Sequence, residues 1–103
     1  MNRIWCALCA ALLAGAVHAQ QYPNRPVRII VPFGTGAPDT VARLVGPQLS
    51  SQLGQPFVVE NRTGANGVIG TDAVAKSPGD GYTLLIVSTS IVVNPSIYKK
   101  LPY

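Results

Sequence analysis

Three short stretches rich in glycine or hydroxyl side chains each follow an apolar run in this sequence. They are Gly34–Asp39, Thr63–Gly67 and Ser88–Ser90. In an open α/β sheet, such corners lie at the carboxyl ends of strands, where these folds bind ligands. Backbone N–H groups at a corner, and at the start of the helix behind it, suit an anion. The first corner therefore predicts a site for a carboxylate.

Single residues of these corners also have simpler interpretations. Gly34 and Gly36 can serve only to permit a tight turn. Asp39 can cap the following helix or contact a ligand amine or hydroxyl, and capping is favoured because a free carboxylate repels a bound one. The hydroxyls of Ser88–Ser90 can bind a ligand or form a turn with their own backbone. Arg62 can pair with a carboxylate or face solvent.

A nucleotide- or phosphate-binding α/β enzyme is the alternative function for the glycine-rich corners. The Gly34-x-Gly36 pair lacks the third glycine of the dinucleotide-binding motif, because Asp39 stands at its position. Glu60 is the one candidate ribose ligand after the second apolar run, and the P-loop motif is absent from the sequence. The residues favour a carboxylate over a nucleotide.

The balance of residue types limits the class of protein. The 103 residues suffice for one small domain, and 48% hydrophobic with 12% charged residues indicate a folded core. The formal net charge of +4 is spread along the chain, and only Lys99 and Lys100 are adjacent among the basic residues. The sequence has no basic stripe of the kind that predicts nucleic-acid binding, whereas its positive charge suits small anions.

The first 19 residues have the pattern of a secretory signal peptide. Arg3 precedes an apolar run over 4–17, and Val17–Ala19 fits a small-x-small cleavage site. The run is too short to span a bilayer. Cleavage after Ala19 removes every cysteine and histidine of the chain. The mature part then has no residues for a Cys/His metal site, a disulfide or a histidine-based catalytic site. We expect a periplasmic protein with no cofactor, no metal and no catalytic residue.

The apolar pattern predicts an alternation of strands and helices. Strands are expected over 27–31, 57–59 and 82–87, with helices over 39–53 and from 68 to about 76. Five apolar residues of the first helix form one stripe, as in an amphipathic helix: Val41, Leu44, Val45, Leu49 and Leu53. The order predicts an α/β fold of parallel βαβ units with right-handed crossovers, so all three corners lie at one edge of the sheet.

An ordered series of short motifs covers nearly all of the mature chain. It consists of Tyr22-Pro23-x-Arg25-Pro26-Val27-Arg28-Ile29-Ile30-Val31-Pro32-Phe33, Asp39-x-Val41-Ala42-Arg43, Leu53-Gly54-Gln55-Pro56, Val59-Glu60-Asn61-Arg62-x-Gly64-Ala65-x-Gly67-x-Ile69-Gly70, Val74-Ala75, Asp80-Gly81-Tyr82-Thr83-Leu84-Leu85 and Asn94-Pro95-x-x-Tyr98-x-x-Leu101-Pro102-Tyr103. In this series the sequence resembles the substrate-binding receptors of tripartite tricarboxylate transporters, the Bug family.

The resemblance implies a periplasmic solute receptor of the type II periplasmic-binding-protein fold, whose two α/β lobes close on a small carboxylate. Such a receptor passes its ligand to a membrane permease and catalyses no reaction. In the family, the first corner holds a carboxylate through backbone amides and ordered water, and bridging waters cost little affinity. Carried over to this sequence, the ligand-binding residues are Phe33, Gly34, Thr35, Gly36, Ala37, Asp39, Ala65, Asn66, Gly67, Ser88 and Thr89.

Two departures from the family pattern bear on the site. The first corner is one residue shorter than usual, and Ala37 stands where the second glycine of a Gly-Gly pair falls. The Cβ of Ala37 can obstruct a close approach of the ligand to the backbone. The chain also stops at Tyr103, partway through the first lobe. We therefore expect residues 1–19 to be the signal peptide and residues 20–103 the truncated opening of that lobe, with the second lobe absent.

Overall fold

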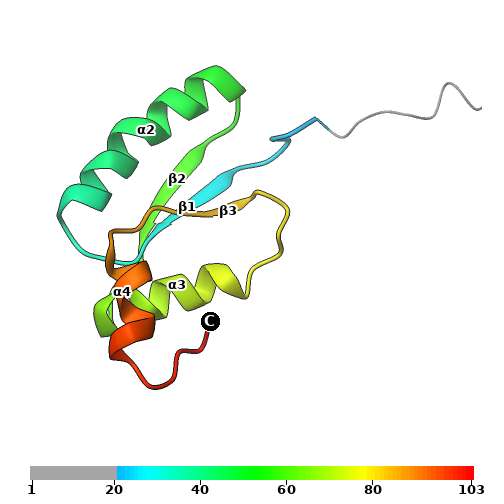
Figure 1. Ribbon diagram of the computed structural model, residues 1–103. Helices are drawn as coiled ribbons and strands as arrows, with labels where there is room; N and C mark the ends of the chain where they lie inside the picture. Colours follow the sequence, from blue (N-terminus) through cyan, green and yellow to red (C-terminus); the bar gives the residue numbers. More distant parts are fainter. Residues whose placement is uncertain (1–20) are drawn as a thin grey trace, which may run out of the picture.

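Strands and helices alternate along the whole described part of the chain. The computed structural model describes residues 21–103, and the expected signal peptide lies outside them. The elements are, in order, β1 (Val27–Val31), α2 (Ala37–Leu53), β2 (Phe57–Asn61), the short 3-10 turn η1 (Ala65–Gly67), α3 (Val68–Ala75), β3 (Thr83–Leu85) and α4 (Ser90–Ile97) (Figure 1).

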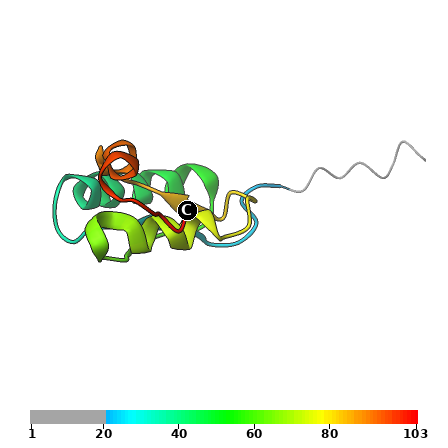
Figure 2. The same cartoon turned by 60° about the horizontal axis from the view of Figure 1, so that its bottom comes forward.

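The strand β1 is the centre of a three-stranded parallel sheet with the order β2-β1-β3. Ile29 of β1 lies in register with Val59 of β2 and Leu84 of β3. The helix α2 packs on β1 and β2, whereas α3 packs on β1 and β3. Because the two crossovers run in opposite directions across the sheet, their helices cover opposite faces (Figure 2). The α/β fold with parallel βαβ units is confirmed.

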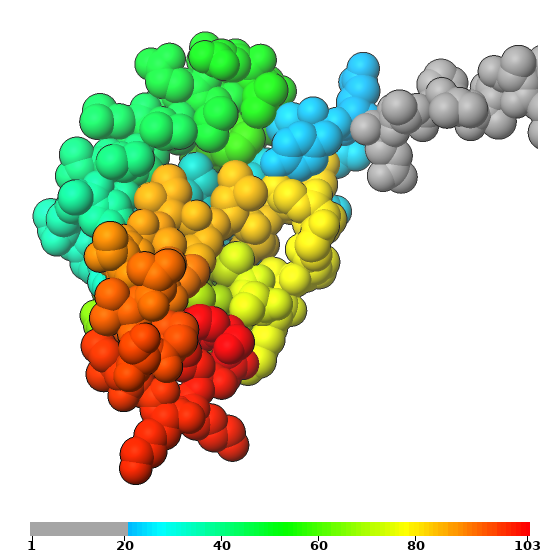
Figure 3. Space-filling view, viewed as in Figure 1, coloured from blue at the N-terminus to red at the C-terminus, as the bar shows by residue number. Residues whose placement is uncertain are grey.

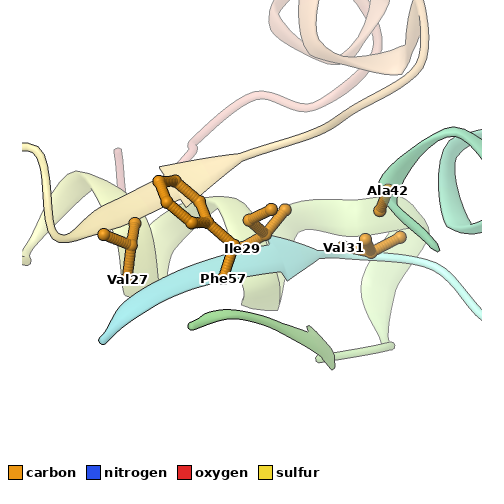
Figure 4. Close-up of a cluster of buried hydrophobic side chains, with 5 residues drawn as sticks. All are labelled: Val27, Ile29, Val31, Ala42 and Phe57. Carbon is orange, nitrogen blue, oxygen red and sulfur yellow. The ribbon is translucent and has the colours of Figure 1, made fainter. Parts of the chain in front are cut away.

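The hydrophobic core lies between β1 and α2. Val27, Ile29 and Val31 alternate along β1 and meet Phe57 of β2 and Ala42 of α2 on one face of the sheet (Figure 4). Each of the three β1 residues is at most 1% exposed. A strand that is covered on both faces needs a continuous apolar run, and this explains the composition of β1.

Of the apolar stripe predicted on α2, only Leu49 packs against the core, and the other four residues are exposed. Leu44 is 67% and Val41 48% exposed, whereas Ala42 and Gly46 are buried. A Cβ added to Gly46 would lie 3.4 Å from the carbonyl oxygen of Phe57. Small residues therefore let α2 approach the sheet closely, and residue size rather than hydrophobicity selects the buried face.

Two boundaries toward the end of the chain differ from the prediction. The strand β3 covers only Thr83–Leu85, and the helix α4 occupies Ser90–Ile97, where the sequence pattern predicts no element. The β-branched run over 91–93 has no helical period, and Pro95 lies inside the helix. Helix α4 is thus held by its contacts rather than by local propensity.

A cluster of aromatic and charged side chains closes the opposite, amino edge of the sheet. The guanidinium of Arg25 lies 4.0 Å from the centre of the Tyr82 ring and forms an ion pair with Asp80 at 3.0 Å. The ring of Tyr22 packs edge-on against Tyr82, and its hydroxyl donates to the carbonyl of Gly81. These contacts join the segment before β1 to the turn before β3. The motifs that begin at Tyr22 and at Asp80 therefore stabilise the fold at the edge opposite the corners.

Replacing Gly70 by alanine should destabilise this fold. An added Cβ would lie 2.6 Å from Cβ of Pro32 and 2.7 Å from the carbonyl oxygen of Arg62. Overpacking of this kind costs about 1–3 kcal/mol, and we expect Gly70→Ala to lower the free energy of unfolding in urea by that amount. Gly79→Ala is the control, because no atom lies within 4 Å of its added Cβ. Equal stability of the two variants would contradict the close contact of α3 with the first corner.

Candidate functional site

The three polar corners lie together at the carboxyl edge of the sheet (Figure 1). They span residues 32–36 between β1 and α2, 62–67 between β2 and α3, and 86–89 between β3 and α4. Since the strands are parallel, each of them delivers its corner to the same edge. The predicted convergence of the corners is confirmed.

The first corner presents the uncapped start of α2. The helix begins at Ala37, two residues before the predicted start, because a proline such as Pro38 is accepted in the first turn. The first intrahelical bond runs from the N–H of Thr40 to the carbonyl of Gly36 at 2.9 Å. The N–H groups of Gly36, Ala37 and Asp39 precede that bond, and no side chain caps them. These groups suit an anion.

Asp39 does not cap the helix, so that prediction is wrong. The residue is only 8% exposed. Its carboxylate accepts the Nε–H of Arg43 at 3.1 Å and the amide of Asn61 at 2.9 Å. These bonds, that from Asn61 first and that from Arg43 second, hold the pKa of Asp39 below its ordinary value. The charged carboxylate of Asp39 is therefore already paired with protein groups.

Asn61 links the first corner to the end of β2. Its amide nitrogen also donates to the carbonyl of Phe33 at 2.9 Å, and its oxygen accepts a hydrogen bond from Arg43 at 2.8 Å. Asn61 is not among the site residues predicted from the sequence, where it appears only within the motif Val59-Glu60-Asn61-Arg62. Its pairing with Asp39 spans 22 residues of sequence and leaves no local pattern.

The second corner is a left-handed turn against the first. Residues Gly64, Ala65, Asn66 and Gly67 all have positive φ, of 131°, 49°, 54° and 85°. The ring of Phe33 packs against Gly67, where an added Cβ would lie 2.8 Å from its Cζ atom. The structure therefore brings the predicted site residues Phe33 and Gly67 together.

The third corner forms one side of an open hollow of about 440 Å³. The hollow is lined by Ala37, Pro38 and Val41 of the α2 side and by Ile86, Val87, Ser88 and Thr89. In Figure 3 the orange segment from β3 into α4 lies beside the teal start of α2. Among the described residues, the second corner contributes nothing to this lining. Three of the predicted site residues, Ala37, Ser88 and Thr89, thus share a hollow.

The hydroxyl of Ser88 forms the local turn that its position allows. Its Oγ donates to Oγ of Ser90 at 3.2 Å and accepts the Ser90 N–H at 3.4 Å. Thr89 is exposed beside it, as are Gly34, Thr35 and Gly36 in the first corner and Ala65 and Asn66 in the second. Of these exposed residues, only Thr89 lines the hollow.

Glu60 and Arg62 pair with protein groups. Arg62 lies 2.6 Å from Glu60, and Arg28 lies 2.8 Å from the other carboxylate oxygen. These bonds, that from Arg62 first, hold the pKa of Glu60 below its ordinary value. These ion pairs support neither the ribose contact considered for Glu60 nor the carboxylate contact considered for Arg62.

Two further properties concern residues 21–103 only. No helix in this range combines the length and the apolarity needed to cross a membrane. In the same range, no three His, Cys, Asp or Glu side chains are grouped as metal ligands.

A parallel α/β unit with its ligand corners at one sheet edge is the class of structure found in periplasmic binding proteins, and solved structures similar to this chain are of that class. Residues 41–103 match the family model TctC, the tripartite tricarboxylate transporter family receptor. The chain belongs to this family, as its sequence motifs predict.

Individual relatives agree with this assignment. BugT of Bordetella pertussis is 50% identical over 99 residues, which cover 93% of this chain and 30% of BugT. The structure of Rpa4515 of R. palustris with adipate has a TM-score of 0.76 at 42% identity, covering 80% of this chain and 28% of the other. For MatC from Rhodopseudomonas palustris with bound malate, the TM-score is 0.59 at 43% identity, covering 62% and 22%. The chain spans about 30% of the length of the curated relatives it matches.

The loss of folding stability at acidic pH should depend in part on Asp39. Because its pKa is lower in the folded than in the unfolded chain, the ionised carboxylate stabilises the fold fully above about pH 4–5 and loses this effect as the pH falls through the folded pKa. We expect Asp39→Asn to be less stable at pH 7 and to lose less stability on acidification to pH 3. Glu60, whose pKa is also lowered, contributes to the decline that remains.

Asn61→Ala tests the cause of that shift. Because the amide of Asn61 is the largest contribution to it, the substitution should raise the pKa of Asp39 toward its ordinary value. The measurement is a titration of the Asp39 carboxyl carbon by NMR. An unchanged midpoint in Asn61→Ala would contradict the assigned role of the amide.

Proposed function

We propose that residues 20–103 form the opening part of the first lobe of a periplasmic receptor that binds a small carboxylate for uptake. The observation that carries the proposal is the uncapped start of α2 beside the hydroxyls of Ser88 and Thr89, which together line or rim one hollow. Family membership and relatives solved with adipate and malate support the same chemistry.

The charge distribution at the first corner is compatible with a bound carboxylate. The N–H groups of Gly36, Ala37 and Asp39 provide donors at the positive end of the helix dipole. The nearby carboxylate of Asp39 is turned to Arg43 and Asn61 and is nearly buried. Its charge is balanced by the guanidinium, so repulsion of an anion at the helix start is reduced.

The other expectations for the protein follow from receptor function. A receptor releases its ligand unchanged, and residues 21–103 contain neither histidine nor cysteine for acid-base or nucleophilic catalysis. We propose that the signal peptide directs the protein to the periplasm and that its partner is the membrane permease of a tripartite transporter. The ligand-binding residues proposed are those of the three corners, Phe33–Ala37 with Asp39, Ala65–Gly67, and Ser88 with Thr89.

Carboxylate binding is testable with a full-length receptor that includes residues 20–103. Isothermal titration with adipate and with malate should give heat of binding, and ATP should give none. Ser88→Ala and Thr89→Val each remove one hydroxyl from the hollow and should weaken the affinity about 3- to 10-fold, the effect of one neutral hydrogen bond. Ser51→Ala, an exposed hydroxyl on α2, is the matched control. Binding of ATP instead of the dicarboxylates would support the nucleotide alternative.

Residues 20–103 expressed alone should bind these dicarboxylates very weakly or not at all. The hollow is bounded only by the α2 start and the third corner, and small-ligand sites bury most of the ligand surface. Calorimetry of this segment should therefore show no saturable binding at micromolar ligand. Micromolar affinity would mean that these residues form a sufficient site by themselves.

A further inference from the structure

The second corner contains a backbone conformation that needs outside support. Glycine adopts positive φ freely and asparagine tolerates it, but Ala65 at φ 49° does not belong to either class. It lies within a run of four residues with positive φ, Gly64 to Gly67. Such conformations persist only where the surrounding structure fixes them. The contacts of this turn therefore show what holds it.

Asn94 of α4 supplies the support. It is the most deeply buried polar residue of the described chain, at 1% exposure. Its amide nitrogen donates to the backbone carbonyl of Asn66 at 3.1 Å, and its side-chain oxygen accepts the Asn66 amide at 3.0 Å. The two asparagines thus form a reciprocal pair across 28 residues of sequence. Phe33 packs on Gly67 from the other side.

The position of Asn94 links this pair to the third corner. Helix α4 begins at Ser90, directly after Ser88 and Thr89, and packs against η1 of the second corner (Figure 1). Asn94 lies about one helical turn from that start. A displacement of the hydroxyl corner therefore moves the group that holds the left-handed turn.

We propose that Asn94 is a positioning residue that fixes the left-handed turn of Ala65 and Asn66 and joins the second and third corners into one unit. The consequence for ligand affinity rests on the proposed carboxylate-binding function, because a corner that is already ordered costs less to bind with. The buried amide of Asn94 needs both of its partners in Asn66, so each residue constrains the other.

The backbone part of the proposal is tested without a ligand. In a full-length receptor that includes residues 20–103, the Cα and Cβ chemical shifts of Ala65 and Asn66 report positive φ by NMR. Asn94→Asp keeps the size and the acceptor but loses the donor to the Asn66 carbonyl, and it should move both residues away from left-handed shifts. Asn94→Ala is the larger perturbation. Asn24→Ala removes a hydrogen bond to Tyr82 at the opposite edge and should leave these shifts unchanged.

The binding part uses adipate as the probe. Asn94→Asp should weaken adipate binding about tenfold, which corresponds to ~1.4 kcal/mol. The double variant Ala65→Gly with Asn94→Asp should regain the affinity and keep Asn66 left-handed, because glycine adopts the turn without support. A loss of general stability alone would not be rescued in this way.

Each outcome decides the proposal. Left-handed shifts that persist in Asn94→Asp would overturn it, and so would unchanged adipate affinity after the turn is lost. If the parent protein binds only malate, malate replaces adipate as the probe. If it binds neither adipate nor malate, the proposed carboxylate function fails. The chemical shifts then still decide whether Asn94 holds the turn.

Discussion

The burial of β1 on both faces is the constraint from which the rest of the structure follows. Its side chains are shielded by α2 on one face and by the α3 side on the other, at 0–1% exposure for Val27, Ile29, Ile30 and Val31. Helices on both faces of the sheet require two crossover connections that run in opposite directions. With right-handed crossovers, this arrangement places β1 in the middle of the sheet. The chain therefore winds away from β1 to both sides, and the start of α2 and the corner after β3 border the hollow.

The first corner is held in place by a side-chain network rather than by a helix cap. The side-chain amide of Asn61 donates to the carbonyl of Phe33, before the helix, and to the carboxylate of Asp39, within it. Arg43 donates to the same carboxylate and to the side-chain oxygen of Asn61. A capping side chain would occupy the N–H groups at the start of α2. Because the network anchors the corner without using those groups, no side chain occupies them.

The sequence predicts the parts of this structure that depend on local pattern. The β-branched run of β1, the glycine after α2 and the alternation of elements identify the α/β fold and the common edge of the corners. The spacing of residue types does not predict contacts between residues that are far apart in the sequence, or packing that depends on the size of a side chain. Gly46 faces the sheet because it has no side chain, and Asn61 and Asn94 find their partners 22 and 28 residues away. Neither pairing leaves a trace in a window of sequence.

Recognition of charge and recognition of the particular ligand have separate sources in such a site. Backbone N–H groups at a helix start bind any anion of suitable access, whatever the side chains. Two relatives that are 42% and 43% identical to this chain are solved with adipate and with malate, two dicarboxylates of different length. Similarity over this segment therefore does not select between them. We expect the choice to depend on side chains that line the hollow, such as Ala37, and on whatever faces its open side. Ala37 is the informative position, because it lines the hollow and its own N–H is one of the uncapped groups at the start of α2.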